Sequence, residues 1–237
     1  FNINKGLHLA RALLRDLGDM RVPCGTEYLD LISPQYIADL ISWGAIGART
    51  TESQTHRELA SGLSCPVGFK NATAGDVQVA VDAIGSASQP HHFLSVTKGG
   101  HSAIFKTAGN KDCHVILRGG KQPNYDMFST DDTAALLTGS NLSPRIMIDA
   151  SHANSRKKPT RQIDVTIDIA NQIRRGDGRI FGVMPVHVYG HVINMKKLKQ
   201  IANEFNLKGF GASKPDNVPR PSIASKVNGK GVVVTIS

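Results

Sequence analysis

The chain has 237 residues, of which 40% are hydrophobic and 20% are charged, as in an ordinary globular protein. No apolar run approaches the roughly 20 residues that a membrane-spanning helix needs, and the first residues lack the pattern of a signal peptide, so we expect a cytoplasmic protein with no membrane contact. The net charge of +9 is uneven, because residues 185–237 hold 8 of the 28 basic and 2 of the 19 acidic residues.

The first 184 residues are therefore close to neutral, whereas a nucleic-acid-binding domain would show a basic face on its folded part. We expect no nucleic-acid partner. The cysteines are Cys24, Cys65 and Cys113, and no two of them form a CxxC pair. An odd number of isolated thiols is typical of a reduced cytosolic protein.

Short apolar runs recur along the chain and alternate with helical patterns. The predicted strands are 25–30, 45–50, 67–71, 93–97, 101–105, 113–119, 145–152, 179–184 and 232–236. The predicted helices are 7–17, 34–43, 77–84, 131–137, 165–173 and 194–206; Ser33 and Pro34 open the second, and Thr130 caps the fourth. Strands that alternate with helices in this way predict a parallel sheet covered by helices.

Two topologies fit this α/β pattern: an open, doubly wound sheet and a closed barrel. The first predicted strand is not followed by GxGxxG, and the chain holds no GxxxxGK[ST], so the nucleotide-binding version of the open sheet is not favoured. The runs 93–97 and 101–105 are joined through Lys98, Gly99 and Gly100 and predict a hairpin outside the alternating pattern.

Charged side chains stand at the ends of the predicted strands. Glu27, Lys70 and Arg118 end or nearly end their runs, and Arg49 and His152 follow theirs closely. In a barrel these ends form the active-site face. Taken singly, each cation could also form a salt bridge at the rim, and Glu27 could be the partner of one of them. His152 could also be a buried core histidine with a structural role.

Three cations directed at one mouth would repel each other. At about 6 Å and an effective dielectric near 20, each pair costs on the order of 2–3 kcal/mol. A ligand with two or three negative charges would relieve that cost, and Arg grips phosphate or carboxylate in two-point fashion. The pattern therefore favours a small phosphorylated carboxylic acid as the ligand.

Several long and unusual motifs carry a family resemblance. They are GAIGARTTESQ at 44–54, HRELASGLSCPVGFKN at 56–71, LSVTK at 94–98 with GHSAI at 100–104, LRGGK at 117–121 and SHANS at 151–155. These motifs resemble the signatures of class I 3-deoxy-D-arabino-heptulosonate 7-phosphate (DAHP) synthase, over residues 1 to about 184. The resemblance implies a (β/α)8 TIM barrel and a transferase. That enzyme condenses phosphoenolpyruvate with erythrose 4-phosphate, the first step of the shikimate pathway to the aromatic amino acids.

The resemblance also implies roles for single residues. Phosphoenolpyruvate would be bound by Glu27, Ala48, Arg49, Lys70 and Arg118. Lys70 and His152 would be catalytic, and His152 would be one of four ligands to a divalent metal such as Mn, Fe, Co or Zn, which polarises the aldehyde.

The family further implies a homo-oligomer and feedback inhibition by an aromatic amino acid. The positions that match the regulatory pocket are Pro34, Gln35, Leu63, Ser64 and Ser95.

The chain departs from the family pattern in two places. The GPCS and KPRT motifs of the first two barrel strands do not occur, so we expect a truncated barrel that lacks these strands and has open sheet edges. After Met184 the family continues with a Glu that binds the metal, and Val186 stands at that position. The Cys ligand of the GPCS motif and a later Asp ligand are missing as well. His152 would then be the one ligand of four retained, and we expect the truncated chain to be inactive by itself.

Residues 1–184 are therefore predicted to form the partial barrel, and residues 185–237 a basic tail unrelated to the family, with a helix at about 194–206 followed by a loop. The tail weakly resembles a stretch of DegT-type sugar aminotransferases, but the cofactor contacts of that family are missing, so we expect no pyridoxal phosphate. Two alternatives stay open. One is a non-catalytic fragment that pairs with an intact subunit, and the other is a related synthase that joins phosphoenolpyruvate to a different sugar phosphate.

Overall fold

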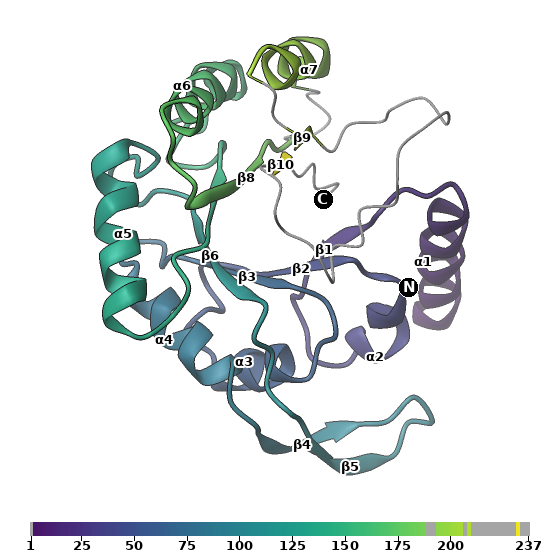
Figure 1. The fold of residues 1–237 in the computed structure, drawn as a ribbon. Helices are drawn as coiled ribbons and strands as arrows, with labels where there is room; N and C mark the ends of the chain where they lie inside the picture. Colours follow the sequence, from purple (N-terminus) through teal and green to yellow (C-terminus); the bar gives the residue numbers. More distant parts are fainter. Residues whose placement is uncertain (1, 188–192, 206–207, 210–230, 233–237) are drawn as a thin grey trace.

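The computed structural model describes residues 2–187, 193–205, 208–209 and 231–232. An eight-stranded sheet curls around a central axis, with helices on its outer side (Figure 1). The strand order is β1-β2-β3-β6-β7-β8-β10-β9, and all neighbouring strands are parallel. Within the described residues β1 and β9 are the edges of the sheet. This mixed α/β fold is a curled half-barrel, consistent with the truncated barrel predicted from the sequence.

The elements follow one another in the alternating order that the sequence indicates. The strands are β1 (Gly25–Glu27), β2 (Trp43–Ile46), β3 (Val67–Lys70), β6 (Cys113–Leu117), β7 (Ile146–Asp149), β8 (Ile180–Met184), β9 (Lys208–Gly209) and β10 (Gly231–Val232). The helices are α1 (Ile3–Asp19), α2 (Pro34–Ile37), η1 (Ala38–Leu40), α3 (Gln54–Ser61), α4 (Gln78–Ala87), α5 (Met127–Gly139), η2 (Pro159–Arg161), α6 (Gln162–Arg174) and α7 (Met195–Glu204).

The predicted hairpin is confirmed. It consists of β4 (His92–Val96) and β5 (Ser102–Lys106), which pair antiparallel in a separate two-stranded sheet. In Figure 1 the hairpin projects outward from the ring of helices. Among the described residues, every helix is too short or too polar to cross a bilayer.

Apolar side chains fill both faces of the central strands. The larger cluster lies between the sheet and the helices and includes Phe69, Ile148 and Ile169. A smaller cluster lies on the inner face of the sheet and consists of Trp43, Ala45, Ile116, Met147 and Met184. Because both faces are buried, these strands read in the sequence as continuous apolar runs rather than alternating ones.

Two helix predictions need correction. The helix predicted for 34–43 is too long, because α2 ends at Ile37, η1 ends at Leu40, and Trp43 begins β2. Trp43 pairs with Gly25 of β1, and its indole donates to Nε2 of buried His114 over 3.2 Å. The helix α3 was not predicted, since its polar sequence buries little more than His56, Leu59 and Ala60.

The remaining predicted helices are present, with longer or slightly shifted bounds. The N-cap of α5 is Asp126, whose carboxylate accepts from two backbone N–H groups, and not Thr130 as predicted. In the predicted tail, α7 lies within 194–206, and β9 and β10 extend the central sheet. Most of the loop predicted to follow that helix, and residues 233–236 of the last predicted strand, lie outside the described residues.

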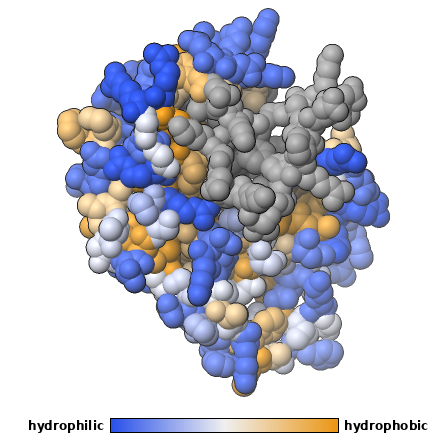
Figure 2. Space-filling model, viewed as in Figure 1, coloured by the Kyte–Doolittle hydropathy of each residue, from blue (hydrophilic) through white to orange (hydrophobic). Residues whose placement is uncertain are grey.

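The exposed surface mixes polar and apolar side chains, and hydrophilic ones cover most of the described part of the face in Figure 2. Exposed apolar residues include Leu9 and Leu13 on α1 and Leu94 and Ile104 on the hairpin.

Gly68 on β3 provides a test of the packing on the inner face. A Cβ at this position would lie 2.5 Å from Cδ1 of Ile116 and 2.8 Å from Nε2 of His114. We expect Gly68→Ala to lower the free energy of unfolding in urea by about 1–3 kcal/mol, because the added methyl group would overpack the inner face. The matched control is Gly85→Ala in α4, where no atom lies within 4 Å and helix propensity predicts a gain of up to about 1 kcal/mol. Equal stability of the two variants would contradict this packing.

Candidate active site

The strand ends bring the predicted site residues to one edge of the sheet. The strands are parallel, so their carboxyl ends lie on the same side. Glu27 and Lys70 are the last residues of β1 and β3, and Arg118 directly follows β6. Arg49 and His152 lie in the loops after β2 and β7. All five therefore stand on the face where barrel enzymes carry their chemistry.

Lys70 is the centre of this group. The residue is only 7% exposed, and its Nζ lies 3.6 Å from Oδ2 of Asp149 and 3.7 Å from Oε2 of Glu27. Sequence reasoning anticipated a pairing with Glu27 but missed Asp149. The available signal was a carboxylate that ends the otherwise apolar run 146–149.

Asp149 is completely buried, and its own loop satisfies its carboxylate. Oδ1 accepts from the backbone N–H of Ser151 at 2.8 Å and from Ser151 Oγ at 2.6 Å, and Oδ2 lies 2.8 Å from Nδ1 of His152. Burial by itself would raise the pKa of Asp149. The His152 hydrogen bond and the charge of Lys70 outweigh it and lower that pKa below its usual value. The carboxylate is therefore ionised at neutral pH.

The loop that carries His152 has an unusual backbone. His152 has φ +50°, and Arg156 and Lys157 in the same loop have φ +50° and +57°. Residues other than glycine adopt positive φ at a cost in free energy, and such residues cluster at functional sites. The side chain of His152 is 38% exposed, so the reading as a buried core histidine is wrong. The buried histidine of the sheet interior is His114, whose burial lowers its pKa to about 3.

Three asparagines join the loops after β3, β6 and β7. The amide of buried Asn71 accepts from the backbone N–H of Arg118 at 2.8 Å and donates to the carbonyl of Gly119 at 3.0 Å. Asn124 donates to Asn71 at 3.3 Å through its side chain and to Asn154 at 2.8 Å through its backbone. This network fixes the backbone of Arg118 beside Lys70.

The turn after β2 is attached to β3 by a buried hydroxyl. Thr51 Oγ1 lies 2.9 Å from the carbonyl of Gly47 and 2.8 Å from that of Lys70, so Ala48 and Arg49 are held next to the end of β3. Arg49 is exposed. Among the described residues, neither Arg49 nor Arg118 has a carboxylate within ion-pair distance, which leaves both guanidinium groups for an anion.

The charge balance differs from the one the sequence suggested. Three cations were expected to face each other directly, but Glu27 and Asp149 lie beside Lys70 and offset part of that repulsion. Arg49, Lys70 and Arg118 together with Glu27 and Asp149 still carry one excess positive charge. The edge therefore attracts a negatively charged ligand, with Arg49 and Arg118 as donors that pair with no described carboxylate; Arg118 makes one long bond of 3.4 Å to the Gly119 carbonyl.

The described residues do not assemble the expected metal site. No three His, Cys, Asp or Glu side chains among them are grouped in a way that would hold a metal ion, whereas catalytic metals normally take three or more protein ligands. Val186, at the position expected for a Glu ligand, packs against the inner apolar cluster. The Gln162 side-chain amide donates to the carbonyl of Val186 and accepts from its backbone N–H, both at 2.9 Å.

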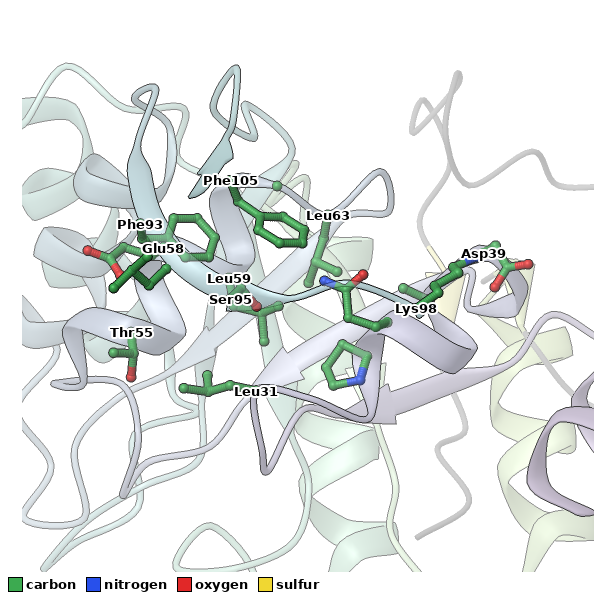
Figure 3. A pocket seen from close by; sticks show the side chains of 15 residues that line it. Leu31, Asp39, Thr55, Glu58, Leu59, Leu63, Phe93, Ser95, Lys98 and Phe105 are labelled. Atoms are coloured by element: carbon green, nitrogen blue, oxygen red, sulfur yellow. The ribbon is translucent and has the colours of Figure 1, made fainter. Parts of the chain in front are cut away.

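A cavity lies under the hairpin, away from the strand-end site (Figure 3). Four of the five residues predicted for a regulatory pocket line it, namely Pro34, Gln35, Leu63 and Ser95. Ser64 is exposed and does not line this cavity.

The two ends of this cavity differ in character. At one end Phe93 and Phe105 stack with ring centroids 6.0 Å apart, and at the other end lie Asp39 and Lys98 (Figure 3). Arg11 on α1 grips the Asp39 carboxylate with bonds of 2.7 and 2.8 Å, which lowers the pKa of Asp39 to about 2. The cavity therefore offers an aromatic wall and a charged wall.

Comparison with known proteins gives a consistent result. A family model described as the DAHP synthetase I family matches residues 1–206. The phospho-2-dehydro-3-deoxyheptonate aldolase of Haemophilus influenzae is 60% identical over 185 residues, 78% of this chain and 51% of the relative. The Phe-sensitive enzyme of that name from Escherichia coli is 59% identical over 184 residues, 78% of this chain and 53% of the relative. The chain thus spans about half the length of these curated relatives.

The fold comparison agrees. A solved structure of phospho-2-dehydro-3-deoxyheptonate aldolase from Francisella tularensis SCHU S4 superposes with a TM-score of 0.80 at 50% identity, covering 87% of this chain and 67% of that one. The family match reaches residue 206, beyond the boundary predicted at Met184, while a tail unrelated to the family remains a prediction. This chain belongs to the DAHP synthetase I family.

Proposed function

We propose that this member of the DAHP synthetase I family binds phosphoenolpyruvate at the carboxyl ends of its strands. Its site would serve the condensation of phosphoenolpyruvate with erythrose 4-phosphate to DAHP, the first step of the shikimate pathway. The observation that carries the proposal is the buried ammonium of Lys70. It is held between two carboxylates at 3.6 and 3.7 Å, at the sheet edge where Arg49 and Arg118 follow β2 and β6 without pairing with a described carboxylate.

Each residue would have a distinct part in binding. Arg49 and Arg118 would grip the phosphate and the carboxylate in two-point fashion, and Lys70 would add a point charge between them. Glu27 would position Lys70, and the turn at Ala48 would lie against the ligand. The methylene carbon of bound phosphoenolpyruvate would then form a bond to the aldehyde carbon of the second substrate near His152, and the aldehyde oxygen would take up a proton. Water would add to the carbon that carries the phosphate, and inorganic phosphate would leave.

Removing single cations tests the phosphoenolpyruvate site. We expect Lys70→Met and Arg118→Met each to weaken phosphoenolpyruvate binding at least tenfold, because a hydrogen bond to a charged group contributes about 1.5–3 kcal/mol. Isothermal titration calorimetry measures the Kd. The matched control is Arg15→Met, an exposed arginine of α1 that pairs with Asp16 and should bind as the native chain does. No binding by the native chain at millimolar concentration would refute the proposal.

DAHP formation tests how far the chain carries the reaction by itself. We expect no turnover when the purified chain is mixed with both substrates and Mn²⁺, because the aliphatic side chain of Val186 cannot bind a metal ion. Turnover of about 1 per second or faster, the range of ordinary enzymes, would contradict this expectation. A mixture with an intact family member, analysed by size exclusion, tests the alternative of a fragment that pairs with a complete subunit.

We further propose that the cavity under the hairpin binds an aromatic amino acid as a feedback effector. Relatives carry the names Phe-sensitive, Trp-sensitive and tyrosine-inhibited, which supports regulation of this kind. The rings of Phe93 and Phe105 would contact an aromatic side chain. The opposite charges of Asp39 and Lys98 suit an ammonium and a carboxylate group.

Filling the cavity tests the effector site. We expect calorimetry to detect binding of phenylalanine, tyrosine or tryptophan to the native chain. Ser95→Trp should abolish that binding, because the new side chain occupies the cavity. Ser102→Trp places the same bulk on an exposed position of the neighbouring strand and should bind normally. Unchanged affinity in Ser95→Trp would place the effector elsewhere.

A further inference from the structure

Asp149 touches the two residues expected to be catalytic, and neither the sequence motifs nor the charge pattern singled it out. We propose that Asp149 is a positioning residue that holds the His152 ring with Nδ1 protonated and Nε2 open to a ligand, and that links this ring to Lys70. The link to an occupied phosphoenolpyruvate site rests on the proposed function. The tautomer does not.

The hydrogen-bond donors around Asp149 determine the tautomer of His152. An ionised carboxylate accepts and cannot donate. Ser151 Oγ lies 2.6 Å from Oδ1 of Asp149 and 2.9 Å from Nδ1 of His152. Because Oδ1 can only accept, the single hydroxyl proton goes to Oδ1, and the oxygen lone pairs face Nδ1. Nδ1 of His152, 2.8 Å from Oδ2, must therefore be the donor in that contact. In a neutral ring, Nε2 then carries a lone pair.

Hydrogen bonds from neighbouring residues hold the loop that carries the His152 ring. His152 has φ +50°, and its carbonyl accepts from the N–H of Lys157 at 2.7 Å. The Asn154 amide donates to the Asp149 carbonyl at 2.8 Å and to that of Leu117 at 3.2 Å, which ties the loop to β6 and β7. The hydrogen bond between the Asp149 carboxylate and the His152 ring adds a side-chain link between the end of β7 and this loop.

Asp149 also bears on Lys70. The 3.6 Å separation between Nζ and Oδ2 is longer than the N–H···O hydrogen bonds of about 2.7–3.2 Å found in proteins. Charge holds the ammonium near Asp149, while its N–H donors make no hydrogen bond to any described residue. An anion that takes these donors would move Nζ relative to Asp149 and change the field at the His152 Nδ1–H.

Imidazole ¹⁵N NMR on histidine-labelled protein, at a pH where the ring is neutral, measures the tautomer directly. The chain has nine histidines, and the His152 signals are assigned with His152→Gln. We expect native His152 to be protonated at Nδ1. Protonation at Nε2 in the native chain would overturn the proposal without any variant of Asp149.

Asp149→Asn provides the second test. Its amide oxygen would keep the bond from the Ser151 N–H, so its NH₂ would face Nδ1 of His152 and force the proton to Nε2, as a wrong tautomer does in other carboxylate–histidine pairs. The control is Asp177→Asn, which removes a partly buried carboxylate that pairs with Arg179 at 2.7 Å. Asp177 lies before β8, so this variant should leave the tautomer of His152 unchanged. A His152 that keeps its Nδ1 proton in Asp149→Asn refutes the positioning role.

The link to Lys70 is tested by adding phosphoenolpyruvate during the same experiment. We expect saturating ligand to shift the Nδ1 signal of native His152, and we expect no shift in Lys70→Met. Binding seen by calorimetry without a shift would overturn the link. Absence of binding would instead refute the proposed function, while the tautomer result still tests Asp149.

Discussion

A buried ammonium group needs counter-charges, and this requirement organises the carboxyl edge of the sheet. Lys70 ends β3 with 7% exposure and takes its counter-charges from Glu27 on β1 and Asp149 on β7. Removing one member of a buried ion pair typically costs about 3–5 kcal/mol. The arrangement therefore requires that these three strands keep their register, and the asparagine network around Asn71 holds the loops that surround the pair.

The apolar inner cluster gives this charged layer its setting. Trp43, Ala45, Ile116 and Met147 fill the inner face of the sheet beneath the strand ends. Charges above such a layer are less screened than charges in water, so an anion at this edge gains more from Arg49, Lys70 and Arg118. The same layer explains the close approach of Gly68 to Ile116, where a larger side chain has no room.

The sequence predicted the alternation of strands and helices, the hairpin, and the placement of the charged residues at the strand ends. Prediction from the sequence failed where contacts between distant segments determine the local structure or the role of a residue. Trp43 begins β2, where it pairs with Gly25 and its indole meets His114. The largely polar sequence of α3 hides that helix. Asp149 was missed because it lay inside the predicted strand 145–152, and β7 in fact ends at Asp149. Its importance depends on Lys70 and His152 meeting it in space, and no local pattern shows that.

A crystal structure of the chain with phosphoenolpyruvate would test the proposed site directly. We expect the ligand at the carboxyl edge, with its phosphate and carboxylate bound by Arg49, Lys70 and Arg118. We also expect Nζ of Lys70 to turn from Asp149 toward the ligand, while Asp149 keeps its bond to Nδ1 of His152. A ligand bound elsewhere, or an edge that stays empty at saturating concentration, would refute the proposed site.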